Sequence, residues 1–451
     1  MSLLSNKSKS FLGITIGHFV HCYDYALYGS FVWLFQEIIF QGGGQLAIML
    51  SYALISLPYV TAPIGTILIG QLGDKFGRKL VLQITVGISI VATALIGILP
   101  IYEHIGILSP IFLFTIRAIQ GLGGSSETSS VFSMSIEQYD KSKYRFFIGS
   151  ISQLNFSLGI GFAAIVIAIT KYCIDIETFK NWGWRIPFLF SGIIGIVCFI
   201  LRASLKESDA FKSIKKAYKT PLLEVLKRYK KQLLIGFAIE ILLALNFYII
   251  NFFAMSSILQ KKDLSIDISL ILLFNMVAGI IIKPIVGLIA DKYSTFNKKA
   301  NRKIYIIIGI FLVLIQIPGL YILNTSNNIA LILFINFLWY SLVASGYAIT
   351  TTTFVDLFPP EIRVTGIAAS MSISGILVQG ISALIIPFLF IKYSVMSVSI
   401  FTTMTSIFGI TIISLFLNTT RKISFNIIII LLLGMFIFGN FLAMISRYLY
   451  I

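Results

Sequence analysis

The sequence predicts an all-α polytopic membrane protein, and composition, segment length and internal repetition each support that prediction. Of the 451 residues, 57% are hydrophobic and only 12% are charged, with a mean hydropathy of +0.93. A soluble domain is about half apolar and about a quarter charged, so this chain lacks the polar surface of a water-facing globule. Its hydrophobicity excludes disorder. A disulfide scaffold is excluded by three scattered cysteines, which are Cys22, Cys173 and Cys198.

Long apolar segments follow one another along the chain, each near or above the ~20 residues that cross a ~30 Å hydrocarbon core. The first is too long for a signal peptide and contains Asp24, so we interpret it as a transmembrane helix. A further hydrophobic segment, 424–445, is a possible thirteenth helix. The other segments are 11–39, 47–69, 80–100, 107–130, 146–170, 186–201, 232–258, 266–290, 304–323, 329–355, 364–391 and 394–417.

The net charge of +17 has an explanation in the topology of the chain. If the N-terminus is cytoplasmic, most lysines and arginines fall in loops on the cytoplasmic side, as the positive-inside rule requires. No polybasic arm or stacking platform indicates nucleic-acid binding. The Ile-, Lys- and Asn-rich composition suggests an AT-rich bacterial genome. We therefore expect a multi-pass protein of the bacterial inner membrane.

Two loops repeat one another. The sequence GQLGDKFGRK (70–79) follows the second apolar segment, and GLIADKYSTFNKKANRK (287–303) follows the eighth. A second repeat has nearly the same separation in the sequence: Glu137, Arg145 and Gly149 correspond to Asp356, Arg363 and Gly366. Parallel repeats place a substrate site near the bilayer midplane, between the halves. The predicted organisation is a six-helix bundle at 1–202, a basic linker at 203–231, a second six-helix bundle at 232–418 and an extension at 419–451.

The first of these loops carries a resemblance to a known family. Gly70, Gly73, Asp74, Lys75, Gly77, Arg78 and Lys79 resemble the cytoplasmic 2–3 loop of the major facilitator superfamily. Further segments resemble its metabolite:proton symporter family, which includes proline/betaine, α-ketoglutarate, citrate and shikimate carriers. These segments are YDYALYG (23–29), RAIQGLGGSSE (117–127), WGWRIPF (182–188), LRASLKESDAF (201–211) and LFPPEIRVTG (357–366). The resemblance implies the major facilitator fold and a proton-coupled transporter.

Asp24 and Arg117 are the first candidates for proton coupling, because a charge inside the membrane usually has a function and a partner. From the helical rise, Asp24 lies ~18 Å from the cytoplasmic side and Arg117 ~15 Å from the outer side. These depths nearly coincide in a ~30 Å core, which predicts an ion pair. The resemblance implies the same roles, since related sugar carriers use such a pair for coupling. A static salt bridge is the alternative.

His21 and Glu127 are further candidates for proton coupling. His21 shares a helix face with Asp24 and could accept protons near neutral pH, although a hydrogen-bonded packing histidine fits equally. Glu127 could be an inner proton relay or a gate partner, or a residue hydrated from the cytoplasm. The family usually has Asn, Glu and Trp at the positions of His18, His21 and Cys22, so this chain departs from the pattern there.

Polar and aromatic residues of the first, fourth and seventh segments are candidates for the substrate cavity. An aromatic face could contact a quaternary ammonium by cation–π attraction, and buried polar groups could instead hold helices together. Ala62 stands where the family tends to have Arg, which weakens an anionic-substrate interpretation. Lys283 is expected to snorkel toward the cytoplasm. The cavity candidates are Tyr23, Tyr28, Gln120, Glu240 and Asn246.

The repeated loops predict a cytoplasmic gate. Asp74 can meet a helix N-terminus and nearby cations, and because both halves have such a loop they can latch when that side is closed. This role is conformational. The gate candidates are Gly70, Gly73, Asp74, Gly77, Arg78, Lys79, Gly287 and Asp291.

These features predict proton-coupled symport of a small metabolite or osmolyte, proline/betaine-like, by alternating access. The alternatives are symport of a di- or tricarboxylate and, in another class, a transporter-like membrane sensor. An enzyme is disfavoured because no clustered metal site, Gly-x-Ser-x-Gly or phosphate-binding loop occurs. The expected partners are the solute, protons and the lipid bilayer, for a monomer without cofactor or metal.

Overall fold

The computed structural model describes residues 6–40, 45–214, 218–251, 253, 268–296 and 300–416. Within these ranges the regular structure is helical and contains no strand. Ten of the helices there are long and apolar enough to cross a membrane. The all-α membrane prediction is therefore confirmed, whereas the possible helix at 424–445 lies outside the described residues.

The first group of helices corresponds to the first six apolar segments. The π-helical turn η1 (Thr66–Gly70) and the short α3 (Gln71–Lys75) continue α2. Short elements at the other end of the group are α5 (Tyr102–Ile105), α8 (Ile176–Thr178) and η2 (Phe179–Gly183). The long helices are α1 (Asn6–Ile38), α2 (Gln45–Gly65), α4 (Arg78–Gly97), α6 (Leu108–Glu137), α7 (Arg145–Cys173) and α9 (Arg185–Ala203).

The second group begins after two short helices, α10 (Asp209–Lys212) and α11 (Pro221–Arg228). The predicted segment 364–391 forms one helical run with a π-helical turn inside it, namely α17 (Arg363–Ser374), η5 (Gly375–Gly380) and α18 (Ile381–Lys392). A 3-10 turn, η4 (Pro360–Ile362), precedes it. The remaining helices are α12 (Lys230–Tyr248), α14 (Ile268–Phe296), α15 (Ala300–Thr325), α16 (Ile329–Leu357) and α19 (Val395–Leu415).

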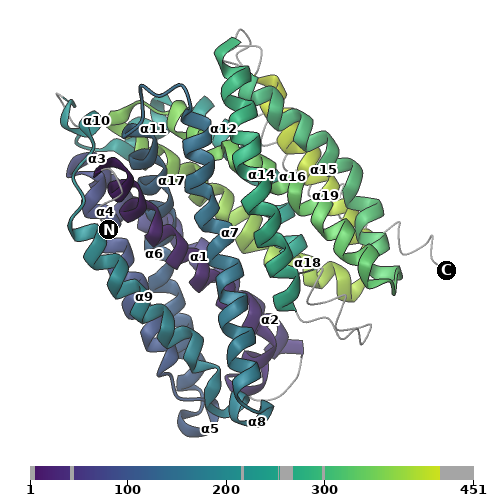
Figure 1. The fold of residues 1–451 in the computed structure, drawn as a ribbon. Helices are drawn as coiled ribbons and strands as arrows, with labels where there is room; N and C mark the ends of the chain where they lie inside the picture. The colour runs from purple at the N-terminus through teal and green to yellow at the C-terminus, as the bar shows by residue number, and fades with distance from the viewer. Residues whose placement is uncertain are drawn as a thin grey trace.

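The two groups lie side by side, with the helices up to α9 on one side and α14 to α16 and α19 on the other (Figure 1). They meet mainly along α7 and α14, with further contacts of α17 on α6 and of α18 on α2. The elements α3, α10 and α11 lie at one end of the molecule, and α5 and α8 lie at the opposite end (Figure 1). We call the first of these the basic end, because the Lys- and Arg-rich loops 70–79, 137–145 and 203–214 belong to it.

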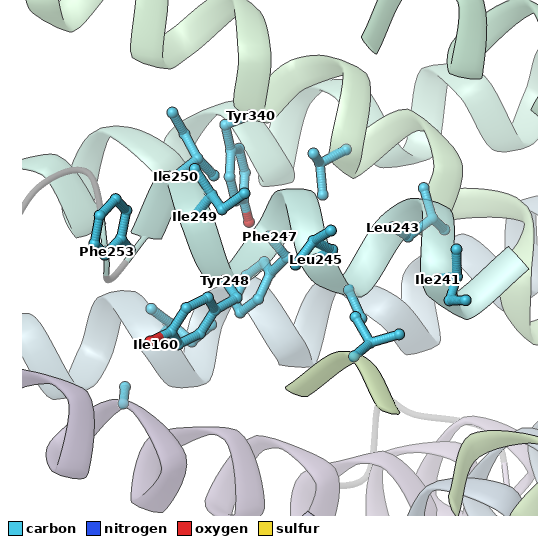
Figure 2. Packing of buried hydrophobic residues seen from close by; sticks show 14 of the residues in the cluster. Ile160, Ile241, Leu243, Leu245, Phe247, Tyr248, Ile249, Ile250, Phe253 and Tyr340 are labelled. Atoms are coloured by element: carbon cyan, nitrogen blue, oxygen red, sulfur yellow. The ribbon is translucent and has the colours of Figure 1, made fainter. Parts of the chain in front are cut away.

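Burial separates α12 from the other spans. In its most hydrophobic stretch α12 is 94% buried, against 39–44% for the other candidate spans. Figure 2 shows why: α12 passes between Tyr340 of α16 on one side and Ile160 of α7 on the other. The outer helices instead expose apolar side chains such as Leu68, Ile193 and Leu314. Such an apolar exterior is what lipid tails require of a helix bundle.

Candidate functional site

A cavity of about 140 Å³ lies between the two groups of helices, room for several waters or a small metabolite. The first group contributes polar side chains to its wall, among them His21, Asp24, Arg117 and Gln120. The second group contributes Glu240 together with aromatic and polar side chains. The structure thus brings together five of the residues that the sequence marks for proton coupling or for the cavity.

Asp24 and Arg117 are connected by a chain of hydrogen bonds. Arg117 Nη1 donates to Gln120 Oε1 at 2.9 Å, and Gln120 Nε2 donates to Thr93 Oγ1 at 2.9 Å. Thr93 Oγ1 in turn donates to Asp24 Oδ2 at 2.7 Å. Every donor in this chain points toward the carboxylate, so the charge of Asp24 organises the side chains as far as the guanidinium.

The prediction of a direct ion pair is therefore wrong. Among the ion pairs of the described ranges, none joins Asp24 to Arg117. Gln120 lies three residues after Arg117, on the same helix face, and its amide occupies the place of a direct contact. Asp24 also accepts a hydrogen bond from Ser191 of α9. Its charge is consequently shared by hydroxyl donors from two other helices.

Arg117 is anchored through a proline of the neighbouring helix. Arg117 Nε donates to the carbonyl oxygen of Leu54 at 3.0 Å. In a regular helix that carbonyl would accept from the N–H of residue 58, but Pro58 has none. The free carbonyl of α2 therefore takes the guanidinium, whose Cζ also lies 3.5 Å from the ring centroid of Tyr28. Of the three guanidinium nitrogens of Arg117, Nη2 alone has no hydrogen-bond partner among the described residues.

The unusual residues of α1 border the same cavity. His18, His21 and Cys22 all line it, and the rings of His18 and His21 stack with centroids 6.5 Å apart. Cys22 Sγ lies 3.8 Å from His18 Nε2. The structure leaves His21 a candidate for proton binding, because its ring borders the cavity that contains Asp24.

Glu127 does not reach the cavity. It forms a buried pair with Arg202 of α9, in which Arg202 Nη2 and Nη1 donate to its two oxygens at 2.5 and 2.9 Å. Thr85 donates a further hydrogen bond to it. Glu127 is only 3% exposed, so the interpretation as a residue hydrated from the cytoplasm is wrong. Its ion-pair partner belongs to the same group of helices, so the interpretation as a gate partner between the two groups is also wrong in this conformation.

Sequence reasoning missed Arg202, because the residue directly follows the apolar segment 186–201, where a cation is expected to face the cytoplasm. In the structure its side chain is fully buried and also donates to the carbonyl oxygens of Ile14 and Leu82, at 3.1 and 2.6 Å. One signal was present. Gly17 leaves the space on α1 in which the guanidinium lies, and a glycine inside a hydrophobic helix often marks such a close approach.

Three predicted cavity residues lie elsewhere. Tyr23 points to α9, where its hydroxyl donates to the carbonyl oxygen of Pro187 at 3.0 Å. Tyr28 lies under Arg117 rather than in the cavity wall. Asn246 Oδ1 accepts from Trp339 Nε1 at 3.0 Å and from Gln316 Nε2 at 2.7 Å. Asn246 thus holds helices of the second group together, because its side chain has partners on facing helices.

Lys283 does not snorkel. Its side chain is fully buried, and Nζ donates to the carbonyl oxygen of Gln153 at 2.7 Å and to Ser157 Oγ at 2.8 Å. Both acceptors belong to α7. Between Lys283 and the basic end, Gly287 of α14 packs closely against Phe147 and Ser150 of α7. The ammonium therefore connects the two groups of helices.

At the basic end, each repeated loop meets a helix N-terminus of the other group. Asp74 accepts from the backbone N–H groups of Val364 and Thr365 at 3.1 and 2.8 Å, at the start of α17. Asp291 accepts from Phe146 and Phe147 at 2.8 and 2.9 Å, at the start of α7. The predicted meeting of Asp74 with a helix N-terminus is confirmed, and it occurs twice in equivalent form. A carboxylate there is favoured by free N–H groups and by the helix dipole.

The charged residues of the second repeated pair of loops, around 137–149 and 356–366, also form ion pairs between the two groups of helices. Arg363 Nη1 donates to Glu137 at 2.7 Å, and Arg145 Nη2 donates to Asp356 at 2.7 Å. Arg78 joins the first pair, since Nη2 donates to Glu137 at 3.2 Å. Together these contacts hold the two groups against each other at the basic end in this conformation.

The remaining loop residues shape that contact. Gly77 has φ of 114°, a conformation that other residues adopt only with strain, and it turns the chain into α4. Lys79 Nζ donates to the carbonyl oxygen of Ala203 at 2.8 Å. The other glycines permit close approach: a side chain would meet Ser126 at Gly70, Val364 at Gly73, and Phe147 and Ser150 at Gly287.

Comparison with known proteins identifies relatives that match two thirds of the chain or more. The sequence model of the Major Facilitator Superfamily matches residues 14–383. The chain is 30% identical over 428 residues to the inner membrane metabolite transport protein YhjE of Escherichia coli strain K12, covering 92% of this chain and 94% of that protein. It is 26% identical over 392 residues to the proline/betaine transporter of the same strain, covering 83% and 76%. The shikimate transporter of that strain is 30% identical over 318 residues, covering 67% and 69%.

Solved structures share the fold. The proton:xylose symporter XylE bound to 6-bromo-6-deoxy-D-glucose matches with a TM-score of 0.70 at 16% identity, covering 92% of this chain and 96% of that chain. A partially occluded inward-open structure of XylE from E. coli matches with a TM-score of 0.70 at 15% identity, covering 93% and 100%. At these identities the likeness shows a common arrangement of helices.

Proposed function

This chain belongs to the Major Facilitator Superfamily, a family of transporters rather than enzymes, and we propose that it imports a small metabolite or osmolyte together with protons. The observation that carries the proposal is the hydrogen-bond chain from Arg117 to Asp24 at the wall of a cavity between two groups of helices. It places an acidic group that can take up a proton within three hydrogen bonds of a cation that can bind a substrate.

The coupling follows from electrostatics. When Asp24 is ionised, its charge and the carboxylate of a substrate compete for the one guanidinium of Arg117. Protonation of Asp24 removes one competitor, so substrate binds more tightly to the protonated transporter. Linkage is reciprocal, and a bound substrate therefore favours uptake of the proton. Neither ligand then crosses efficiently without the other.

Alternating access uses the contacts at the basic end. Asp74 and Asp291 each accept hydrogen bonds from a helix N-terminus of the other group. These contacts close that end of the molecule when they form, and the end opens when they break. Asp74 and Asp291 are equivalent in the two repeats, so opening is a rocking of one group of helices against the other. We infer that the basic end faces the cytoplasm, because lysines and arginines gather in its loops. A reporter fused after Lys216 is then cytoplasmic and one after Lys262 external.

The favoured substrate is proline/betaine-like. The relatives named above include a proline/betaine transporter, and Glu240 in the cavity wall disfavours a second substrate carboxylate. A di- or tricarboxylate would need a second cation facing the cavity, but Ala62 occupies the position at which the resemblance anticipates an arginine. Because one relative is a shikimate transporter, the transport assay also includes the monocarboxylate shikimate.

The test is transport into proteoliposomes with and without a pH gradient. Asp24→Asn imitates the protonated state permanently, so we expect exchange of labelled for unlabelled solute to survive while accumulation driven by the gradient disappears. Arg117→Ala should abolish both exchange and accumulation, because it removes the guanidinium that binds the substrate carboxylate. Glu37→Gln is the matched control, since it neutralises an exposed carboxylate of the same helix.

Full gradient-driven accumulation by a folded Asp24→Asn protein would remove Asp24 from the mechanism and transfer its role to His21. Binding without accumulation under any gradient would instead indicate the sensor. Import of proline, betaine, α-ketoglutarate, citrate or shikimate that requires the gradient supports the symporter.

A further inference from the structure

Glu240 is a buried carboxylate that no described residue neutralises. Its side chain lies in the middle of α12, the most buried of the candidate spans. The residue is 5% exposed and lines the cavity. Its Oε1 has no hydrogen-bond partner, and none of the ion pairs formed by described residues includes it. A buried charge without a partner is costly, so a group that visits the cavity is the natural partner.

Three aromatic rings border the same cavity and contact one another. Phe156 and Phe247 have centroids 4.9 Å apart, Phe156 and Tyr347 5.6 Å, and Phe247 and Tyr347 6.2 Å with nearly perpendicular planes. Rings at different inclinations around one space are the arrangement that binds organic ammonium groups through cation–π attraction. Figure 2 shows Phe247 on α12 between α7 and α16.

Lys283 limits which of these rings can serve. Its Nζ already lies 5.3 Å from the centroid of Phe156, so part of that ring's attraction for cations is in use. Phe247 and Tyr347 therefore carry most of the contact with an added ammonium. The ammonium of Lys283 donates its hydrogen bonds to α7, and no ion pair within the described residues joins it to Glu240.

A complementary charge lies in the opposite wall. Arg117 is 3% exposed and lines the cavity from the first group of helices, and its Nη2 lacks a hydrogen-bond partner among the residues that the structure describes. Within the part of the chain that the structure describes, the cavity thus has an incompletely paired cation in one wall and, in the other, aromatic rings and a carboxylate without an ion-pair partner. The ligand that satisfies both walls carries a carboxylate and an ammonium group.

We propose that Glu240, with Phe247 and Tyr347, is the ammonium subsite of the transporter and selects zwitterions over simple anions. The proposal rests on the proposed function and names the substrate class of that site. The substrate is held in one orientation, its carboxylate toward Arg117 and its ammonium toward Glu240. Because the two subsites belong to different groups of helices, a bound zwitterion links them across the cavity, whereas an anion contacts mainly one wall.

The experiment measures binding to the purified full-length protein in detergent, where no proton gradient is needed. Each zwitterion is paired with an isostere in which carbon replaces the charged nitrogen: glycine betaine with 3,3-dimethylbutanoate, and proline with cyclopentanecarboxylate. Wild-type protein should bind at least one zwitterion about tenfold or more tightly than its isostere, because a desolvated ammonium gains both ion pairing and cation–π contact.

Variants assign the preference to Glu240. Glu240→Gln should weaken zwitterion binding about tenfold and leave isostere binding within about twofold, while Glu240→Asp should restore part of the preference. Arg117→Lys should weaken zwitterions and isosteres alike. Glu224→Gln is the control, because that carboxylate pairs with Arg228 outside the cavity.

Equal binding of zwitterions and isosteres by wild-type protein, or no binding of either zwitterion, overturns the proposal without any variant. So does a Glu240→Gln protein that weakens both ligand types equally. A protein that binds zwitterions selectively but shows no gradient-driven import refutes the proposed symport alone. Gradient-driven import of an anion without zwitterion preference refutes the ammonium subsite alone.

Discussion

Replacing Glu127 with Gln removes the anion from a buried pair and leaves the Arg202 guanidinium in place. Arg202 is fully buried, and Glu127 accepts two of its hydrogen bonds. Two helix carbonyl oxygens accept the others, but they supply no neutralising charge. Breaking a buried pair by removing one partner costs about 3–5 kcal/mol. For a helical group of this size that loss corresponds to a fall in Tm of roughly 10 °C.

Removing both charges should restore most of this stability. In the double variant Glu127→Leu, Arg202→Met, neither a buried charge nor an empty space of matching size remains. Thr85 loses an acceptor, yet its hydroxyl still donates to the carbonyl oxygen of Val81 at 2.9 Å. Replacing a buried pair by apolar side chains is often neutral or stabilising. We therefore expect the double variant to lie within about 1 kcal/mol of wild type.

The assay is a double-mutant cycle of Glu127→Leu, Arg202→Met and the double variant on the free energy of unfolding, measured by denaturant titration in detergent micelles and repeated as Tm. A coupling energy of about 3 kcal/mol or more is expected. Single variants that lose less than about 1 kcal/mol, or a double variant as unstable as the sum of the singles, would refute the reasoning. Transport by the double variant also tests the proton-relay prediction for Glu127. Gradient-driven accumulation should persist, because Glu127 lies outside the cavity.

Three further predictions concern packing, gating and the charge between the groups. Gly17→Ala places a methyl group in the space of the buried Arg202 guanidinium and should lose about as much stability as Glu127→Gln. The control Gly87→Ala, whose methyl group would have nothing within 4 Å, should be neutral or slightly stabilising. Equal Tm values for the two variants would contradict the packing of Arg202 against Gly17. Asp74→Asn weakens closure of the basic end. With the other cysteines replaced, Cys22 should then react several-fold faster with a water-soluble maleimide applied from that end; unchanged labelling would argue against the gate. Lys283→Met should have a free energy of unfolding within about 1 kcal/mol of wild type, because the loss of two hydrogen bonds is offset by no longer burying an ammonium group. A loss near 3 kcal/mol in denaturant titration would contradict this and reveal an anion that compensates the charge of Lys283.

The sequence by itself determined the spans and the contacts at the basic end. A helix that crosses lipid needs a continuous apolar segment of fixed length, and that requirement is local, so the positions of the long helices were predicted closely. The contact of Asp74 with a helix N-terminus was also predictable, because a short loop repeated in both halves limits where its carboxylate can reach. The boundaries of the two halves at 202 and 232 stay predictions.

The pairing of charges inside the bundle was decided by the tertiary structure alone. Depth along each helix placed Asp24 and Arg117 at one level, but depth does not fix how far each helix is rotated, and Gln120 with Thr93 came between them. One part was readable in the sequence: Pro58 leaves the carbonyl of Leu54 free for Arg117. Rotation and close packing also turned Lys283 inward toward α7. A side chain's partner across helices depends on the relative placement of whole helices, which the local pattern of residues does not encode.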